Sequence, residues 1–238
     1  MTALRTARDR ARAEITREIK DAARRQLATE GASRLSLRAI ARELGVASSA
    51  LYRYFPSRDD LLTALIMDAY DSLGEHAEHG ADGIPAGDHP RRWGAVCAAI
   101  RSWALAHPQE YALVYGSPVP GYQAPADTIT PASRVWMALL REVRDCAAAG
   151  RLRTQGEDPP LTEAMAAEAD RLAAEVGLEL PHPVLVRSVV AWTQLFGMIS
   201  LELFGHLEGA FTSTETFFAQ AVELTTHLIG LTPDPALS

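Results

Sequence analysis

The sequence lacks the residues and patterns that several large classes of protein require. It has two cysteines in 238 residues, without paired or metal-ligand spacing, which fits a reducing compartment. No continuous apolar run reaches the roughly 18 residues of a membrane-spanning helix. The basic amino terminus also lacks the apolar stretch of a secretory signal. We therefore expect a cytoplasmic protein with no membrane partner.

Enzyme signatures are missing as well. The chain has no GxGxxG, P-loop, GxSxG or CxxC pattern, so it offers no phosphate-cradling loop, nucleophile elbow or dithiol. The one His/Glu cluster, residues 75–79 with His89 nearby, lies in a glycine-rich setting that favours a solvated loop over a metal site. Cys97 and Cys146 lie in apolar patterns that favour inert thiols over a redox switch. The sequence predicts no enzyme, no cofactor and no metal.

Helical periodicity is present almost everywhere, whereas period-2 runs of β-branched residues are nearly absent. The first helix is expected over residues 8–30 and a fourth over 58–73, with a loop over 74–90. Charge is divided unevenly. Residues 1–65 hold 13 basic and 8 acidic residues, while the rest of the chain, net charge −7 overall, holds 10 and 22. A basic segment on an acidic body is typical of a nucleic-acid-binding module.

Residues 37–54 have the pattern of a helix-turn-helix. Ser36 is a candidate amino cap for a helix over 37–44, and Gly45 stands where the turn needs a positive φ. A second short helix is expected over 48–54. The residues predicted to pack the two helices together are Ile40, Leu44, Val46 and Leu51. An ordinary helical hairpin with solvated outer residues is the alternative.

The run SLRAIARELGVASSALYRYFPSRDDLL resembles the DNA-binding domain of the TetR family of one-component regulators. In that family a Ser or Thr opens the second helix, GV forms the turn, and LYxxFxxKxxL closes the third helix and begins the fourth. The matching residues are Ser36, Gly45, Val46, Leu51, Tyr52, Phe55, Arg58 and Leu61. Arg58 replaces the usual lysine and keeps its charge. The resemblance covers about residues 12–65.

This resemblance implies phosphate contacts at the start of the second helix and major-groove contacts from the third. The implied DNA-binding residues are Ser36, Arg38, Ala47, Ser48, Ser49, Ala50, Tyr52, Arg53, Tyr54 and Arg58. Residues 1–11 are expected to form a flexible basic arm. Arg5, Arg8, Arg10 and the adjacent Arg12 either reach a minor groove or attract DNA non-specifically.

The segments AHPQEYALVYGSPVPGYQAP and AWTQLFGMISLELFGHLEG resemble a TetR-family carboxyl-terminal subgroup. Its penultimate helix carries a Trp and then a glycine that usually follows histidine; here Phe196 precedes Gly197. The helices at 183–207 and 211–230 are too apolar to leave exposed, which independently favours a homodimer. The predicted dimer-interface residues are Leu185, Val189, Gly197, Ser200, Phe217, Ala221, Leu224 and Leu228.

The same resemblance implies a chamber for a small-molecule effector. Such sites are mostly apolar with a few polar groups, so aromatic residues are the candidates for its walls. The candidate ligand-binding residues are Tyr70, Trp103, Tyr111, Tyr115, Trp136, Trp192 and Phe196. Each of them has an equal claim to be a core aromatic. The role of residues 151–180, which close the chamber or lie outside it, is left open.

Together these observations predict an all-α fold. A three-helix helix-turn-helix DNA-binding domain (1–65) precedes a larger helical effector-binding and dimerisation domain (66–238), with about nine to ten helices. The predicted function is a dimeric transcriptional regulator, a repressor that a small apolar or aromatic ligand releases from a palindromic double-stranded DNA operator. The alternative is a constitutive DNA-binding protein or an adaptor with no small-molecule effector.

Overall fold

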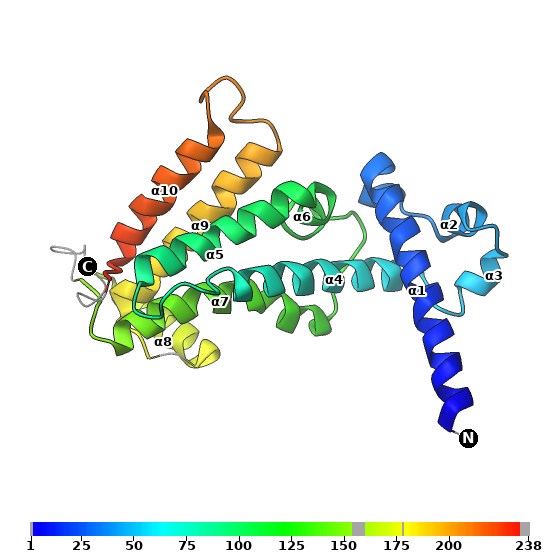
Figure 1. Cartoon of the computed structure of the whole chain (residues 1–238), viewed down its shortest axis with the longest axis horizontal. Helices are drawn as coiled ribbons and strands as arrows, with labels where there is room; N and C mark the ends of the chain where they lie inside the picture. Colours follow the sequence, from blue (N-terminus) through cyan, green and yellow to red (C-terminus); the bar gives the residue numbers. More distant parts are fainter. Residues whose placement is uncertain (1, 154–159, 178, 234–238) are drawn as a thin grey trace. The chain divides into compact units, whose positions relative to one another are not determined.

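The computed structural model describes residues 2–153, 160–177 and 179–233 (Figure 1). Over these residues the chain forms ten α-helices and two short 3-10 helices and no β-strand, which confirms the all-α prediction. Internal contacts divide the chain into two compact units. One joins Met1–Tyr70 to His107–Ile129, and the other joins Asp71–Ala106 to Thr130–Ser238. The boundary after residue 65 separates predicted functions rather than packing units, and it stays a prediction.

The first unit is built around the amino-terminal helix. Its elements are α1 (Thr2–Glu30), η1 (Ala32–Arg34), α2 (Leu37–Glu43), α3 (Ser48–Leu51), the first part of α4 (Arg58–His79), α6 (Pro108–Tyr115) and η2 (Ala126–Thr128). Apolar residues at helical spacing in α1, such as Ile19, Ala23 and Leu27, are buried against Ile40 and Leu51. The three helices of the predicted DNA-binding module therefore share one core.

Two local predictions for this module are confirmed and one is wrong. The Ser36 hydroxyl accepts a hydrogen bond from the Ala39 N–H (3.4 Å), so it caps α2. Gly45 has a φ of 69°, a conformation that glycine adopts without strain. Val46, however, does not pack between α2 and α3, because its side chain is 45% exposed. Leu51 fills the space between these helices instead, at 2% exposure.

Helix α1 begins at Thr2, so the structure has a helix where the sequence suggested a flexible arm over residues 1–11. The reason is local: this stretch contains no Gly or Pro and is rich in Ala and Arg, which are strong helix formers. Helix α4 also runs further than expected, to His79, through part of the predicted 74–90 loop. Gly74 does not end α4. It allows α7 to pack closely against α4, because a Cβ at this position would lie 2.8 Å from the Cβ of Arg134.

The second unit is a bundle with its own core. Its helices are the remainder of α4, then α5 (His89–Ala106), α7 (Ile129–Ala148), α8 (Glu163–Val176), α9 (His182–Leu203) and α10 (Thr214–Ile229). Trp93, Ile100, Leu139 and Ile199 are fully buried in this unit. The predicted connection over 151–160 lies largely outside the described residues. Helix α9 is long and apolar enough to cross a membrane by length and composition alone, but half of its apolar window is buried inside the bundle.

Ion pairs join the helices of this unit, and two of them involve arginines of α5. Arg101 of α5 contacts Glu202 of α9 (2.6 Å) and lies 5.0 Å from the ring centroid of Phe218 on α10. The hydrogen bond from Arg101 lowers the pKa of the Glu202 carboxyl. Arg92 of α5 donates two hydrogen bonds to Glu142 of α7 (2.8 and 2.9 Å), and Glu142 is only 3% exposed. Arg92 also donates to the carbonyl oxygens of Ala81 and Ile84, so one guanidinium fixes the α4–α5 connection to α7.

Candidate nucleic-acid interface

The outward face of α3 and the turn after it is polar and accessible. Arg53, Tyr52 and Ser49 are exposed, Tyr52 to 41% of its surface, and Ser48 is half-buried. Helix α3 itself is shorter than predicted, since Tyr52–Tyr54 continue as a turn. The small Ala47 and Ala50 flank these polar residues and leave room for a close approach to base edges. The arrangement can present one arginine, one phenol and two hydroxyls to a nucleic-acid groove.

The residues implied at the edges of this face differ in how they are held. Arg38 is exposed on α2, beside the Ser36 cap. Tyr54 is half-buried, with the Arg12 guanidinium 5.3 Å from its ring centroid. Arg58 folds back into the unit, donating to the Ala32 carbonyl oxygen (2.9 Å) and to Asp59 (3.3 Å). Its guanidinium thus supports η1 in this structure, beside any role in anchoring a phosphate.

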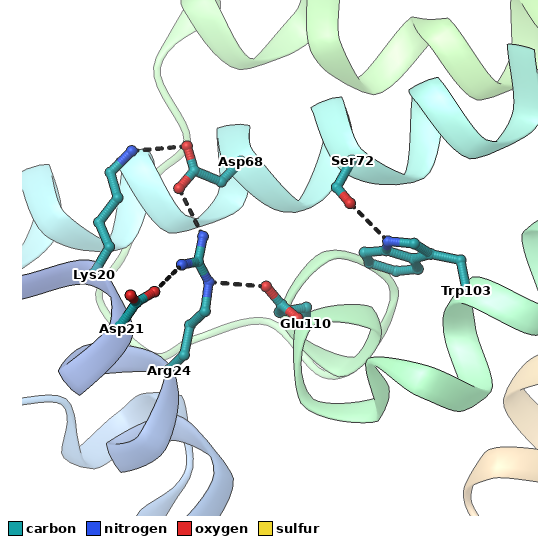
Figure 2. A network of polar contacts seen from close by, with 7 residues as sticks. All are labelled: Lys20, Asp21, Arg24, Asp68, Ser72, Trp103 and Glu110. Carbon is teal, nitrogen blue, oxygen red and sulfur yellow. Dashed lines mark hydrogen bonds and ion pairs between the residues drawn. The ribbon is translucent and has the colours of Figure 1, made fainter. Parts of the chain in front are cut away.

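A polar network that the sequence did not reveal fixes α1 in the first unit (Figure 2). Arg24 contacts three carboxylates: Asp21 (2.8 Å), Asp68 of α4 (2.8 Å) and Glu110 of α6 (3.0 Å). Lys20 adds a second cation on Asp68 (2.7 Å). No sequence signal could have paired these residues, because up to 86 positions separate the partners. Arg24 therefore joins α1 to α4 and α6, in addition to the apolar core that α1 shares with α2 and α3.

Replacing Arg24 with alanine is expected to destabilise this unit. Removing the guanidinium leaves three carboxylates facing one lysine, at a site where the Arg24 and Asp68 side chains are each 32% exposed. Partial exposure limits the cost to about 1–2 kcal/mol, which corresponds to a fall in Tm of roughly 3–6 °C. Thermal unfolding followed by circular dichroism measures it. Arg17→Ala is the matched control, since within the described part of the chain Arg17 forms an ion pair with Glu14 alone, on the surface of α1. Equal Tm values for the two variants would contradict the role given to Arg24.

The candidate ligand-binding aromatics come from both units. Tyr70, Tyr111 and Tyr115 lie together in the first unit, with Tyr115 centred 6.1 Å from Tyr70 and 5.3 Å from Tyr111. The Tyr70 hydroxyl donates to the Val114 carbonyl oxygen (3.4 Å). Burial, with a smaller effect of the neighbouring tyrosines, raises the pKa of Tyr115, so its hydroxyl stays protonated at neutral pH. This cluster can pack against an apolar group.

The other candidates belong to the second unit. Trp192 lies between Trp136 and Phe196, at ring-centroid distances of 5.8 and 5.5 Å. Its indole nitrogen is buried, and no acceptor for its N–H is found among the described residues. Trp103 is 1% exposed and donates to the Ser72 hydroxyl (2.9 Å; Figure 2), so the protein itself satisfies its donor. Trp192 therefore has the donor that a ligand could use, and Trp103 is a core residue.

The candidate dimer-interface residues divide between surface and core. Leu224, Leu228 and Gly197 are exposed, Leu224 to 60% of its surface. Leu185 and Ala221 are buried inside the protomer, at 1% and 4% exposure, and can only support an interface from below. The half-buried candidates are Val189, Ser200 and Phe217.

The sequence analysis missed the other apolar residues exposed on α9 and just after it. Val190, Leu201 and Phe204 recur with Gly197 at helical spacing and are 44–46% exposed. Together with Leu224 and Leu228 of α10 they define an apolar face, called here the α9/α10 face. Periodicity alone could have found this stripe. Of the four interface residues predicted on α9, Gly197 lies on it, Val189 and Ser200 are half-buried, and Leu185 is buried in the core.

No group of three or more His, Cys, Asp or Glu side chains able to hold a metal ion occurs in the described part of the chain. Within the suspected cluster, His79 pairs with Asp82 (3.0 Å), and His76 contacts the Ser72 carbonyl oxygen (2.8 Å). Cys97 and Cys146 are free and buried, and burial raises the pKa of both thiols. A thiol held in its protonated form is a poor nucleophile, which favours a structural role for both.

Comparison with known families agrees with this geometry. Residues 19–65 match the model described as "Bacterial regulatory proteins, tetR family", and residues 93–225 match "Tetracyclin repressor-like, C-terminal domain". The Trp-and-glycine subgroup suggested by the penultimate helix stays a prediction.

Individual relatives cover most of the chain. The HTH-type transcriptional regulator Rv1816 of Mycobacterium tuberculosis H37Rv is 40% identical over 82% of this chain and 83% of its own length. The crystal structure of SCO4313 is 35% identical, with a TM-score of 0.75 over 92% of this chain and 98% of that one. A protein with unknown function from Rhodococcus sp. RHA1 shares the fold, at 24% identity and a TM-score of 0.68 over 91% and 94% of the two chains.

Proposed function

This chain belongs to the TetR family of bacterial regulatory proteins, DNA-binding transcriptional regulators rather than enzymes, and we propose that it is a ligand-responsive repressor. It binds a palindromic operator in the cytoplasm as a homodimer, and a small apolar or aromatic effector releases it. The observation that carries the DNA-binding part is the accessible face of α3, where Tyr52 and Arg53 are exposed beside the capped start of α2. Arginine can bind guanine through two hydrogen bonds, and exposed serines suit bases or phosphates.

Dimerisation is supported by the α9/α10 face. Two copies of one apolar face pack against each other around a two-fold axis, which covers both at once. Gly197 lies within this face and has no neighbouring atom where a Cβ would stand, so it leaves room for a partner helix to approach. The two α3 helices of such a dimer, one from each protomer, would contact two half-sites. These half-sites would lie one helical turn of DNA apart, about 10 base pairs, or a multiple of it.

Effector binding is supported by the two aromatic clusters. The Trp136, Trp192 and Phe196 cluster offers apolar rings together with a buried N–H, the donor of Trp192, which suits a small apolar or aromatic molecule carrying one acceptor. An effector acts by favouring a conformation in which the reading helices no longer fit the operator. The DNA-binding residues outside α3 that we propose are Ser36, Arg38, Tyr54 and Arg58.

The first experiment selects binding sites from random duplex DNA with the full-length protein and measures affinity for the selected site across a salt series. A symmetric consensus bound by a dimer, with affinity that falls steeply with salt, is expected. Selection of no consensus, with binding that moderate salt abolishes, would overturn operator recognition by α3.

Substitution of Arg53 then tests whether the outward face of α3 and the turn after it contacts the bases. Arg53→Ala is expected to weaken binding to the selected site by about tenfold or more, since a good bidentate base contact contributes about 1–3 kcal/mol. Arg144→Ala is the control: Arg144 is an exposed arginine of α7 in the other unit, its one ion-pair partner among the described residues is the adjacent Asp145, and its loss should leave affinity unchanged. Equal effects of the two substitutions would show that charge, and not the position of Arg53, drives binding.

A constitutive DNA-binding protein with no effector is the second candidate. It is favoured by the hydrogen bond from the Trp103 indole N–H to the Ser72 hydroxyl, because a donor bonded within the protein is typical of a filled core. A screen of small apolar and aromatic acids and phenols for release of the operator separates the two. Release by a compound that no longer acts on Trp192→Phe supports the repressor, whereas a screen without any releasing compound favours the constitutive protein.

A further inference from the structure

The amino-terminal half of α1 and the end of α3 enclose a groove that the helix-turn-helix pattern does not account for. Arg8, Arg12 and Ile15 line it from α1, and Ala50, Arg53 and Tyr54 line it from the other side; Asp9 and Ala11 complete its wall. Figure 1 shows this part of α1 running past α3 towards the amino terminus. Arg8, Arg12 and Ile15 follow each other at intervals of four and three residues, so one face of the helix supplies them. The groove thus combines three arginines with one aspartate.

The groove has a net positive charge. Three arginines (Arg8, Arg12 and Arg53) and one aspartate (Asp9) line it. Among the described residues, no carboxylate forms an ion pair with these three arginines, whereas Arg17, Arg24, Arg25 and Arg58 of the same unit are each paired. Other arginines of this unit, such as Arg10 and Arg38, also lack an ion pair among the described residues, but only at the groove do three such arginines line one hollow.

Tyr54 fixes the geometry of the groove. The Arg12 guanidinium lies 5.3 Å from the centre of its ring, a cation–π contact that holds a long, exposed side chain across the groove. A guanidinium stacked through its face keeps its N–H edges available for hydrogen bonds. Two N–H edges at one site match the oxygens of a phosphate.

We propose that this groove binds the DNA backbone, taking one or two phosphates that flank the bases facing α3. The inference rests on the proposed DNA binding and extends it: α1 becomes a contact element, and the footprint becomes longer than the helix-turn-helix alone gives. Arg8 and Arg12 bind phosphates directly, Tyr54 positions Arg12, and Arg53 stands between this groove and the reading face. Because phosphates carry no base identity, the contact adds affinity without sequence preference.

The test uses the full-length protein and its selected site within longer flanking DNA. Arg8→Ala and Arg12→Ala together should reduce affinity about 100-fold or more at 0.1 M salt, since each substitution removes a charge-assisted hydrogen bond to a phosphate. They should also reduce the slope of log affinity against log salt by about 0.9 for each phosphate that the variant no longer binds. Arg10→Ala is the matched control, because Arg10 is an exposed arginine of the same turn of α1 on the opposite side of the helix. It should change affinity no more than about threefold, by the long-range effect of its charge alone.

Neutral methylphosphonate linkages placed one at a time in the flanks locate the contact. The linkage that neutralises the bound phosphate should weaken DNA binding by wild type but not by the Arg8→Ala, Arg12→Ala double variant. This difference establishes the coupling between that phosphate and the two arginines. Arg8→Ala alone leaves the Arg12–Tyr54 contact intact, so it keeps the test valid should the double variant lose stability.

Three results would overturn the inference. The first is an equal loss of DNA affinity in Arg10→Ala and in the double variant, which would mean that the overall charge of α1 explains the effect. The second is a loss that depends on the base sequence of the flanks, which means groove reading by a side chain. The third is wild-type affinity in the double variant. Each of these requires that wild type binds its selected site, so failure of the proposed function itself is seen separately, as no binding by wild type.

Discussion

Substitution of Leu224 with glutamate is expected to convert the proposed dimer into a monomer and to lower operator affinity more than 100-fold. Leu224 is 60% exposed in the protomer and lies on the α9/α10 face, beside Leu228 on the next turn of α10. In a two-fold dimer this position occurs twice, so the substitution buries two carboxylates in an apolar contact. Burying one charge without a partner costs about 3–5 kcal/mol, and two such charges exceed what a dimer of moderate affinity can lose.

Sedimentation velocity measures the oligomeric state, and a titration with operator DNA measures the affinity. Leu105→Glu is the matched control: Leu105 is 42% exposed on α5 and receives the same side chain, but it lies outside the α9/α10 face. We expect this variant to remain dimeric and to bind DNA as wild type does. A dimeric Leu224→Glu protein would mean that another surface mediates assembly. A monomer that still binds the full operator tightly would mean that the two half-sites are read independently.

The helix-turn-helix could be predicted from sequence because its signals are local. The Ser36 cap and the positive φ of Gly45 each depend on residues within one or two turns. The prediction that Val46 packs between α2 and α3 was wrong because a residue next to a turn can point inward or outward. Only the packing of Leu51 decides which side chain fills the space between these helices. Gly74 is a second case in which local sequence is not enough. A glycine often signals the end of a helix, but here it leaves room for Arg134 of α7, which is 60 positions away in the sequence.

Sites built from distant residues were less accessible to sequence reasoning. Helical periodicity identified α9 as apolar on more than one side, but it could not tell which stripe meets the core of the protomer, so Leu185 was chosen and Val190 was not. Aromatic residues were assigned to a single chamber because composition carries no distances; Tyr111 and Trp192 belong to different packing units, and the chamber stays a prediction. The ion pairs of Arg24 join three helices through charges that look like an ordinary solvated surface in the sequence.

The second large effect is expected at the buried pair between Arg92 and Glu142. Glu142→Ala should lower the free energy of unfolding by about 3 kcal/mol, because removing one partner of a buried pair leaves the other charge uncompensated. We place the value at the lower end of the usual range, since the Arg92 side chain remains 21% exposed and keeps its bonds to the Ala81 and Ile84 carbonyl oxygens. For a chain of this size the loss corresponds to a fall in Tm of roughly 6–12 °C.

Two further variants separate the pair itself from the loss of a side chain. The double variant Arg92→Met, Glu142→Leu replaces both charges by apolar groups of similar size and should recover most of the stability, as buried pairs often do when both partners are exchanged. Glu168→Ala removes a carboxylate that pairs with Arg171 on the exposed surface of α8 and should leave the free energy of unfolding unchanged. Chemical denaturation followed by tryptophan fluorescence measures all three. If Glu142→Ala were as stable as Glu168→Ala, the α4–α5 connection would be held by its backbone contacts, and the guanidinium would contribute little to joining α5 with α7.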